Sequence, residues 1–497
     1  MENTIKQPPA LRVFFATEMW ERYGFYVVQS LLALYMALHF KWPDKQVYAL
    51  VGSFTALTYL SPIIGGWIAD QLLGQKRTII TGAFFLFISY IALAFVTSTQ
   101  GLITALAGVA VGTGLLKPNI SSLLGNAYDT DSPQRESGFT IFYMGITSGI
   151  ILGTTLPSYL NLYFGWPVAF TSAAIGMVIA ALVFIMGSKY YKIRDYQQYQ
   201  YSPNKIIKAA LLIAILWSLS FFILFYPHFA DLAFGFVVLL SLSYLVLTYI
   251  HEPTKQANQT MVIGLLCFIS VMFWAFYFQM FLSLTLFIAR VVKPTLLGIK
   301  FPPPYYVSIQ SFGMLFFGYF MSKNKRKLTL EQSGMRTGNK FLLAMCFTTL
   351  AYVFILLVCH FSENSNILLS PLLFIPTYLL ISIAELLLSP VGLAAITTLA
   401  SREKVSTMMG IFFVSLGIGA YLSGKLANLT AIASESMTIV ELKQHYSHTF
   451  TRMFIVLLCA TTFCIVLNKI IKFLLLKYAS YSTSFTNTPS SSSMSNI

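Results

Sequence analysis

The stretch that bears most on the fold is EMWERYGFY at residues 18–26, which lies inside an otherwise apolar segment at 13–38. It carries Glu18, Glu21 and Arg22. A charge near the centre of a bilayer costs at least about 2.5–3.5 kcal/mol, so three of them on one spanning helix are expected to face a wet interior. Residues three and four apart share one side of a helix, so these side chains can reach one another or a common ligand.

Composition places the chain among proteins with many membrane-spanning helices. Hydrophobic residues make up 57% of the 497 residues, and charged residues only 10%. The formal net charge is +15, but the lysines and arginines fall in short loops between apolar runs, so no nucleic-acid partner is expected. The five cysteines lie in apolar segments without ligand spacing, which indicates neither disulfides nor a zinc site.

Fourteen apolar runs approach the roughly 20 residues that a spanning helix needs, and they predict an all-α polytopic membrane protein arranged as six, two and six helices. The runs lie at about 12–38, 47–69, 78–98, 101–125, 138–162, 165–187, 207–226, 229–250, 260–289, 304–322, 341–361, 367–397, 406–429 and 449–475. The predicted divisions are an N-terminal six-helix bundle at 1–188, a linker with an inserted two-helix hairpin at 189–258, a C-terminal six-helix bundle at 259–478 and a Ser-rich disordered tail at 479–497.

The distribution of Lys and Arg predicts the orientation in the membrane. Most of them flank helix ends on the side of the N-terminus, and the opposite connections hold only Lys41, Lys45, Lys293, Lys300 and Lys443. Positive loops remain inside, so both termini are expected to be cytoplasmic. Two six-helix halves joined by a cytoplasmic connection are typical of transporters in which one half rocks against the other around a central site.

Two further charges lie deep in apolar runs. Lys117 follows the glycine-rich segment 112–116, and at about 1.5 Å per residue its depth matches that of Glu18 to Arg22. Glu385 lies in the tenth run of the six-plus-six count, between two prolines that are expected to kink the helix, and it is the obvious mid-membrane charge of the second half. These charges can therefore form one site between the halves.

The loop GGWIADQLLGQKR at 65–77 lies at the cytoplasmic turn between the second and third runs. Its glycines allow close helix approach, and its charged residues can cap helix ends and pair across the turn. The pattern resembles the loop signature of the major facilitator superfamily, which is thought to latch helix packing in one conformational state. The resemblance assigns this latch to Gly66, Asp70, Gly74, Lys76 and Arg77.

Taken together, the motifs strongly resemble the prokaryotic proton-dependent oligopeptide transporter family, over nearly the whole chain. The first-run pattern matches Glu18, Glu21, Arg22 and Tyr26, the Lys-Pro-Asn segment matches Lys117, and the signature of the tenth helix matches 385–393. The resemblance implies the major facilitator fold and the symport of di- and tripeptides with protons, without an organic cofactor or metal. The expected partners are a short peptide or peptide-like substrate and the lipid bilayer, and the expected form is a monomer.

The resemblance also implies roles for single residues. Arg22 and Lys117 would attract the peptide carboxylate, and Glu385 would hold its ammonium group. Glu18 and Glu21 would exchange protons, with Arg22, as a salt bridge to Lys117 forms and breaks. The pocket would be lined by Tyr26, Tyr59, Tyr143, Thr147, Trp274, Phe278, Gln310 and Ser389.

The chain departs from the family pattern in its seventh core helix. Phe278 stands where the family usually has an acid, and a phenylalanine cannot titrate. Thr147 and Gln310 also replace polar residues of the family signatures, and changes in hydrogen-bonding groups can alter substrate choice strongly. We therefore expect proton coupling to depend on the charged residues of the first and fourth runs, without an acid in the seventh core helix.

Other readings follow from the same residues. The fold could carry a non-peptide or peptide-like small molecule with altered or absent proton coupling, or it could bind without transport, as a sensor. An enzyme is not expected, because the histidines lie near helix ends or in loops without ligand spacing or a paired nucleophile. The lack of a large extracytoplasmic domain between the ninth and tenth core helices, which animal members carry, predicts a bacterial cytoplasmic (inner) membrane location.

Overall fold

The computed structural model describes residues 7–128, 133–195, 202–322, 330–401 and 403–486. Almost all regular structure is helical, because long apolar segments in lipid must satisfy their backbone hydrogen bonds internally. The first group of elements is α1 (Leu11–Leu34), η1 (Tyr35–His39), α2 (Asp44–Ile68), η2 (Ala69–Leu73), α3 (Gln75–Phe95), α4 (Thr99–Asn126), α5 (Pro133–Phe164) and α6 (Trp166–Tyr190).

A helical hairpin follows, and then a second group. The hairpin is α7 (Pro203–Phe225) and α8 (Pro227–His251). The second group is α9 (Thr254–Tyr277), η3 (Phe278–Phe281), α10 (Ser283–Val291), β1 (Thr295–Leu296), β2 (Ile299–Lys300), α11 (Pro304–Ser322), α12 (Leu330–Ser362), η4 (Pro371–Phe374), α13 (Ile375–Leu399), α14 (Val405–Ala427), η5 (Asn428–Thr430) and α15 (Ile439–Thr486). Strands β1 and β2 pair antiparallel.

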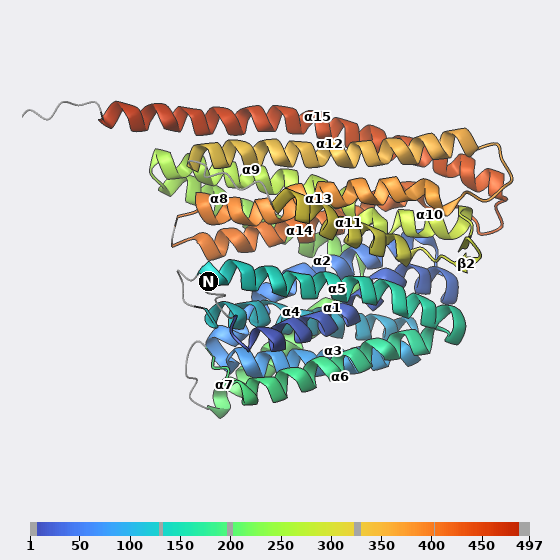
Figure 1. The fold of residues 1–497 in the computed structure, drawn as a ribbon, viewed down its shortest axis with the longest axis horizontal. Coiled ribbons are helices and arrows are strands. Elements are labelled where there is room, and N and C mark those ends of the chain that lie inside the picture. The colour runs from blue at the N-terminus through green and yellow to red at the C-terminus, as the bar shows by residue number, and fades with distance from the viewer. Residues whose placement is uncertain (1–6, 129–132, 196–201, 323–329, 402, 487–497) are drawn as a thin grey trace, which may run out of the picture.

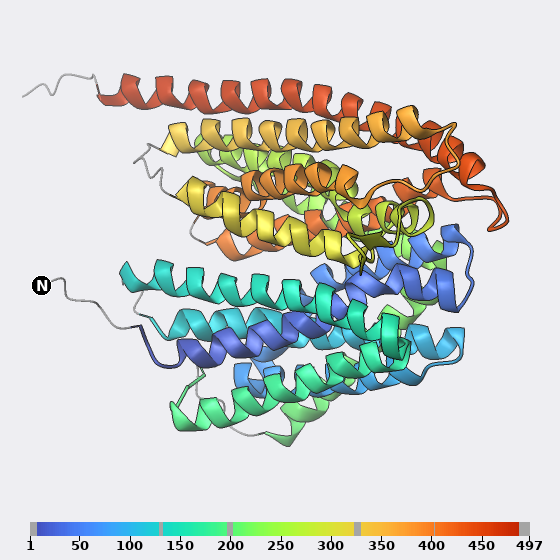
Figure 2. The same ribbon diagram turned by 45° about the vertical axis from the view of Figure 1, so that its right-hand side comes forward.

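The helices pack as two bundles that lie side by side. Helices α1–α6 pack on one another and form what we call the first bundle, and α9–α15 form the second bundle. Figures 1 and 2 show the first bundle in blue to green and the second in yellow-green to red, with helices of both running in roughly the same direction. The bundles meet where α2 packs on α14 and α5 packs on α11.

One of these seams depends on a pair of glycines. A Cβ atom added to Gly52 of α2 would lie 2.9 Å from the Cα of Gly424 of α14, so a larger side chain cannot fit there. Small residues at this crossing let the two backbones approach closely, as is common between membrane helices. The two bundles are therefore in close backbone contact at this crossing.

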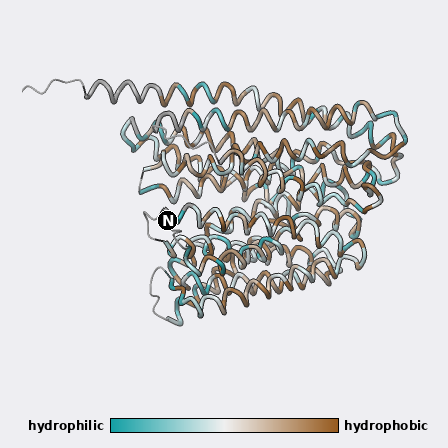
Figure 3. Tube along the Cα trace, in the orientation of Figure 1, coloured by the Kyte–Doolittle hydropathy of each residue, from teal (hydrophilic) through white to brown (hydrophobic). Residues whose placement is uncertain are grey.

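The helix start of α1 and the helix end of α15 lie at the same end of the molecule, which we call the terminal end; the opposite end, with α10 and β2, is the far end (Figures 1 and 2). Among the described residues, twelve helices are long and apolar enough to cross a membrane. Helix α1, with its internal charges, and the shorter α11 complete the expected fourteen. Figure 3 shows hydrophobic residues along the helices and more hydrophilic ones at the helix ends and connections.

The structure corrects two expected boundaries. The run at 260–289 is confirmed as one membrane span, but its α-helix is interrupted, because α9 stops at Tyr277 and the chain passes through η3 before α10. The last helix, α15, continues to Thr486 and so extends into the segment 479–497 that the sequence assigned to a disordered tail. Residues 487–497 lie outside the described part of the chain.

The break between α9 and α10 follows from side-chain hydrogen bonds. The amide nitrogen of Gln279 donates to the carbonyl oxygens of Ala275 and Ser423, at 3.0 and 2.9 Å, and Ser283 donates to the Gln279 side-chain oxygen at 2.6 Å. Polar side chains that bond nearby backbone offer an alternative to helical hydrogen bonds, and irregular backbone is tolerated at membrane depth when protein buries it. Gln279, Ser283 and Ser423 are all buried, and so is Ala275.

Candidate functional site

A cluster of three charges lies on α1 inside the first bundle. One guanidinium nitrogen of Arg22 donates to Glu21 at 2.6 Å and another forms a very short contact with the same carboxylate, while Nε lies 3.5 Å from Glu18. The exposed fractions of Glu18, Glu21 and Arg22 are 1, 0 and 3%. Charge-assisted, two-point pairing of this kind is the strong form of hydrogen bond and offsets the cost of burying the charges.

The cluster is not fully saturated. Among the described residues, the second carboxylate oxygen of Glu18 has no hydrogen-bond partner although it is buried. A buried oxygen without a donor is costly, and such atoms often mark a place where a proton, a water molecule or a ligand group can bind. Glu18 is therefore the member of the cluster with a free position.

Lys117 of α4 lies close to this cluster without joining it. Its ammonium nitrogen is 5.1 Å from the centre of the Tyr59 ring, and its charge interacts with those of Arg22 and Glu18. Within the described part of the chain, no carboxylate lies within ion-pair distance of Lys117. The salt bridge expected between Lys117 and the acids of α1 is thus not formed in this conformation.

Glu385 of α13 supplies the opposite charge from the second bundle. One of its carboxylate oxygens accepts hydrogen bonds from the Tyr277 hydroxyl at 2.7 Å and from the Gln310 side-chain nitrogen at 2.6 Å. No cationic side chain of the described residues pairs with it. Two neutral donors hold this carboxylate in place while its charge remains available for a cation.

A short series of aromatic contacts connects Lys117 of the first bundle with Glu385 of the second. The Tyr59 ring lies 5.1 Å from the Lys117 ammonium nitrogen, and its centre is 5.8 Å from that of Phe278. The Phe278 ring centre is 5.4 Å from that of Tyr277, whose hydroxyl donates to Glu385. These contacts put Lys117 and Glu385 at the two ends of one aromatic group between the bundles.

Aromatic rings from both bundles close one side of this region. The Tyr26 ring centre is 6.3 Å from that of Phe281, and the Tyr59 ring centre is 5.8 Å from that of Phe278. Phe278 in turn lies 5.3 Å from Trp274, and both are buried. An aromatic wall with few directed polar groups suits ligands of variable shape.

The other predicted pocket residues lie on α5 and α13. Tyr143 is 54% exposed, and its backbone carbonyl accepts a hydrogen bond from the Thr147 hydroxyl at 3.2 Å. Tyr143 lies on α5, which packs on α1. Ser389 is half-buried one helical turn beyond Glu385 on α13.

The predicted latch loop lies at the terminal end, where Gly74 has a positive φ of 81° between η2 and α3. Lys76 joins the loop to the segment after α6, because its backbone nitrogen donates to Asp195 at 2.9 Å and its ammonium donates to the Ile193 carbonyl at 2.9 Å. Asp70 and Arg77 are both exposed, and each has an interaction partner.

The glycine of this loop that packs tightly is not the predicted one. A Cβ atom on Gly65 would collide with the backbone of Gly114 in α4, whereas one on Gly66 would lie 3.9 Å from the nearest atom, in Pro118. Close contact of two helix backbones requires glycine at the point of contact. The sequence pattern located the motif but gave no means of telling which of two adjacent glycines faces α4.

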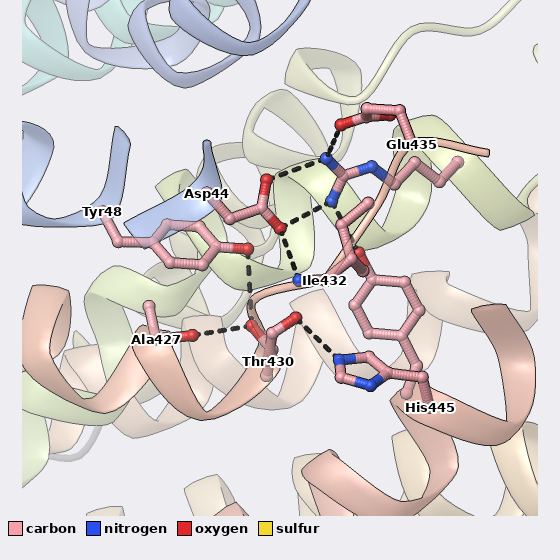
Figure 4. Close-up of polar contacts among 9 residues, drawn as sticks. Asp44, Tyr48, Ala427, Thr430, Ile432, Glu435 and His445 are labelled. Carbon is pink, nitrogen blue, oxygen red and sulfur yellow. Dashed lines mark hydrogen bonds and ion pairs between the residues drawn. The ribbon is translucent and has the colours of Figure 1, made fainter. Parts of the chain in front are cut away.

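A second ionic cluster, which the sequence did not predict, joins the bundles at the far end. Arg290 of α10 donates to both oxygens of Asp44 at the start of α2, at 2.8 and 2.9 Å, and to Glu435 at 2.6 Å. The Tyr446 hydroxyl and the backbone nitrogen of Ile432 complete the contacts, at 2.9 and 3.1 Å. Figure 4 shows Asp44 between Tyr48 on one side and Ile432 and Glu435 on the other.

This cluster crosses from one bundle to the other. Asp44 is 3% exposed, so its charge depends on the donors of the second bundle for compensation. The hydrogen bonds can form only while the far ends of α2 and α10 lie together. In the structure, the far ends of the two bundles are therefore held together by an ionic cluster.

No group of three or more His, Cys, Asp or Glu side chains within the described ranges is arranged to hold a metal ion. The charges that no described side chain of opposite charge pairs with are instead those of Lys117 on α4 and Glu385 on α13. Two helical bundles that present opposite charges to one another across the middle of a membrane define a membrane transport protein of the alternating-access class.

The comparisons with known proteins agree. A model of the POT family matches residues 76–446. Dipeptide and tripeptide permease A of Klebsiella pneumoniae is 30% identical over 466 residues, which is 91% of this chain and 90% of that protein. The permease of the same name from Yersinia pestis is 30% identical over 463 residues, covering 91% of each chain.

A solved structure is similar over the same extent. A mutant of the peptide transporter POT in complex with alafosfalin superimposes with a TM-score of 0.78, at 26% identity, over 94% of this chain and 97% of that one. The chain belongs to the POT family and has the major facilitator fold. The family is one of transporters, so the expectation that the chain is not an enzyme is confirmed.

Proposed function

We propose that this protein imports di- and tripeptides by proton symport with alternating access. The observation that carries the proposal is that Arg22 and Lys117 lie on the first bundle and Glu385 on the second, with Lys117 and Glu385 connected through contacts of Tyr59, Phe278 and Tyr277. A peptide zwitterion that leaves water needs a partner for each charged end. The names of the related permeases, which are dipeptide and tripeptide permeases, support the same substrate class.

In this proposal the peptide carboxylate binds at Arg22 and Lys117, and the peptide ammonium binds at Glu385. Lys117 suits the first role because no described carboxylate pairs with it, so its charge is available to the substrate. Glu385 suits the second because its two donors are neutral. The walls between them are Tyr26, Tyr59, Tyr143, Thr147, Trp274, Phe278, Gln310 and Ser389.

Proton coupling is assigned to the first bundle. Phe278 is buried against Trp274 and Tyr59 and has no titratable group, so η3 cannot exchange a proton at that position. Glu18 has an unpartnered oxygen beside Arg22, and its charge interacts with that of Lys117. Protonation of Glu18 would weaken its attraction for Lys117 and so change how Lys117 binds the substrate carboxylate.

We also propose how the protein is oriented in the membrane and which of its domains move. The terminal end, with the Lys- and Arg-rich connections, is cytoplasmic, and the protein lies in the bacterial inner membrane. The moving domains are the bundles at 1–188 and 259–478, the hairpin at 189–258 connects them, and the loop at 66–77 latches one state. A single chain provides every site residue, which suits a monomeric transporter.

The first test is uptake of labelled dipeptides and tripeptides into proteoliposomes by the wild type, Lys117→Ala and Glu385→Gln. A hydrogen bond to a charged group contributes about 1.5–3 kcal/mol, so each variant is expected to lower apparent affinity by about 10- to 100-fold. Lys45→Ala and Glu403→Gln change exposed residues of the same types and are expected to transport normally. Normal dipeptide uptake by both site variants would reject the site.

The second test separates coupling from transport. Uptake by the wild type is measured with and without an inward pH gradient, and again for Glu18→Gln. We expect the gradient to accelerate wild-type uptake and to leave Glu18→Gln, which still exchanges peptide across the membrane, almost unaffected. Equal wild-type rates in both conditions would exclude proton symport and would favour the alternative, a carrier of peptide-like molecules without coupling.

A further inference from the structure

A cavity that the transport site does not use lies between the far ends of the two bundles. Its volume is about 300 Å³, at the lower end of the range for small-molecule sites. The first bundle contributes the end of α1, the outer turns of α5 and the start of α6, and the second contributes α10, the β hairpin and the start of α11. Because the central charges are not among its lining residues, this cavity is separate from the proposed peptide site.

The wall of the cavity is apolar. Leu31, Leu34 and Leu162 line it from the first bundle, and Ile288 and Val292 line it from the second. Leu162 and the nearby Leu38 are also 38 and 49% exposed, so the apolar lining is continuous with the outer surface of the bundle. An apolar space that is continuous with exposed leucines of a membrane protein suits a hydrocarbon chain better than water or a peptide end.

Two cations stand at the edge of this space. Lys293 and Lys300 both line the cavity and both are exposed. The ammonium nitrogen of Lys300 lies 4.6 Å from the centre of the Tyr163 ring, which keeps the lysine beside α5. Few lysines lie at the far end of this protein, so the presence of two at one cavity points to an anionic group rather than to the general charge of the surface.

The surroundings of the cavity have the character of a membrane interface. Trp166 is part of the lining, at the first turn of α6, and indole rings favour the headgroup level of a bilayer. The tip of the β hairpin carries Leu297 and Ile299, which are 94 and 71% exposed. Large apolar side chains so exposed beside two lysines fit a hairpin that touches lipid headgroups and the first carbons of their chains.

We propose that this cavity binds one acyl chain of an anionic phospholipid of the far leaflet, with the lipid phosphate paired to Lys293 and Lys300. Both bundles line the cavity, so the full site exists only when their far ends lie together as they do here. A ligand that binds one of two conformations shifts the equilibrium toward it. The lipid therefore favours the conformation in which Arg290 and Asp44 are paired.

Fluorescence of Trp166 tests the binding directly and does not depend on transport. The full-length protein is reconstituted in nanodiscs with phosphatidylglycerol or phosphatidylcholine whose chains carry bromine, a contact quencher. The Trp166 signal is the difference between the wild type and Trp166→Phe. We expect stronger quenching by the brominated anionic lipid, and a loss of that preference of about fivefold for each of Lys293→Gln and Lys300→Gln, because each lysine near an anionic surface contributes about 1 kcal/mol.

Two further variants separate the parts of the proposal. Lys45→Gln removes an exposed lysine at the same end that does not line the cavity, and the lipid preference should not change. Ala289→Phe places a ring in the cavity and should abolish Trp166 quenching by either lipid while the protein still binds peptide. Equal quenching by both lipids, unaffected by the lysine variants, would overturn the proposal; peptide uptake could still be intact, so the proposed transport function would not fall with it.

Discussion

Two arginines in this protein are surrounded by carboxylates, but their partners come from different places. Arg22 pairs with acids one and four residues away on its own helix. Arg290 pairs with Asp44, 246 positions away, and with Glu435, 145 positions away. The first cluster is internal to one helix, so it persists whatever the position of the second bundle. The second exists only while the two bundles touch at the far end.

The two clusters are therefore expected to have different roles, one in binding charges and the other in the conformational equilibrium. A cluster that accompanies one helix through every state can bind protons or substrate charges in each of them. A cluster shared between two bundles has to be broken when they separate. Its interaction free energy therefore stabilises the conformation in which the bundles touch at the far end. On this view, changes around Arg22 alter what is transported and how it is coupled, and changes around Arg290 alter which end is open.

The largest effect is expected for Arg22→Leu. The substitution leaves two buried carboxylates without their cation, and removal of one partner of a buried pair typically costs about 3–5 kcal/mol. We expect a lower unfolding temperature in detergent and no uptake, while Arg22→Lys keeps the charge and recovers most of the stability. Uptake and thermal unfolding measured on the same preparations check this. Unchanged unfolding of Arg22→Leu would show that the cluster does not need the guanidinium.

A smaller effect is expected for Arg290→Met, because Asp44 keeps its hydrogen bond from the backbone of Ile432. Charged hydrogen bonds contribute about 1.5–3 kcal/mol, and here the loss should favour separation of the far ends. A double-mutant cycle with Asp44→Asn measures the coupling between the two residues. The rate at which a thiol reagent labels Leu31→Cys reports how far the far ends of the bundles have separated. Labelling that stays at the wild-type rate would argue against a role in closure.

A neutral contact between the bundles should matter less. Thr154 of α5 and Ser308 of α11 share a hydrogen bond of 2.6 Å, and both are buried. A neutral hydrogen bond contributes about 0.5–1.5 kcal/mol, so Thr154→Val should accelerate Leu31→Cys labelling less than Arg290→Met does. Replacing both residues, with Ser308→Ala, should restore part of the loss because no donor is then left alone. An effect as large as that of Arg290→Met would remove the distinction between charged and neutral contacts.

The smallest effect is expected for Glu435→Gln. The Glu435 side chain is 67% exposed, and Arg290 retains Asp44 and Tyr446 as partners. Exposed ion pairs contribute about 0–1 kcal/mol and weaken with salt. Unfolding temperature and labelling should therefore remain close to the wild type, at low and high ionic strength alike. A strong, salt-dependent change in unfolding temperature or labelling would show that Glu435 is a main partner of Arg290 in the far-end cluster.

The contrast also explains what the sequence could predict. Arg22, Lys117 and Glu385 were identifiable because a charge in the middle of an apolar run is costly and conspicuous. Asp44 and Arg290 lie at the ends of their helices, where charges are common, and nothing local connects residues so far apart in the chain. The long-range cluster therefore required the tertiary structure.

Similar limits applied to finer features. Hydropathy predicted one helix at 260–289. It contains no information on the hydrogen bond from Gln279 to the backbone of Ser423, which accompanies the interruption of the helix. Tyr277 was missed as a donor to Glu385, because whether its hydroxyl faces α13 depends on how α9 ends. The one available signal was a tyrosine within the apolar run, next to Phe278, which stands where the family usually has an acid.

The hairpin of α7 and α8 has a mechanical consequence. Helix α7 packs on α4 of the first bundle, α8 packs on α9 and α14 of the second, and only Tyr226 lies between the two helices. Asp231 of α8 pairs with Lys425 of α14 at 2.6 Å, which fastens the second arm. The hairpin thus bridges the two bundles, with a single non-helical residue at its turn. Any change in the spacing of the bundles would therefore have to change the angle between α7 and α8 or break one of these contacts.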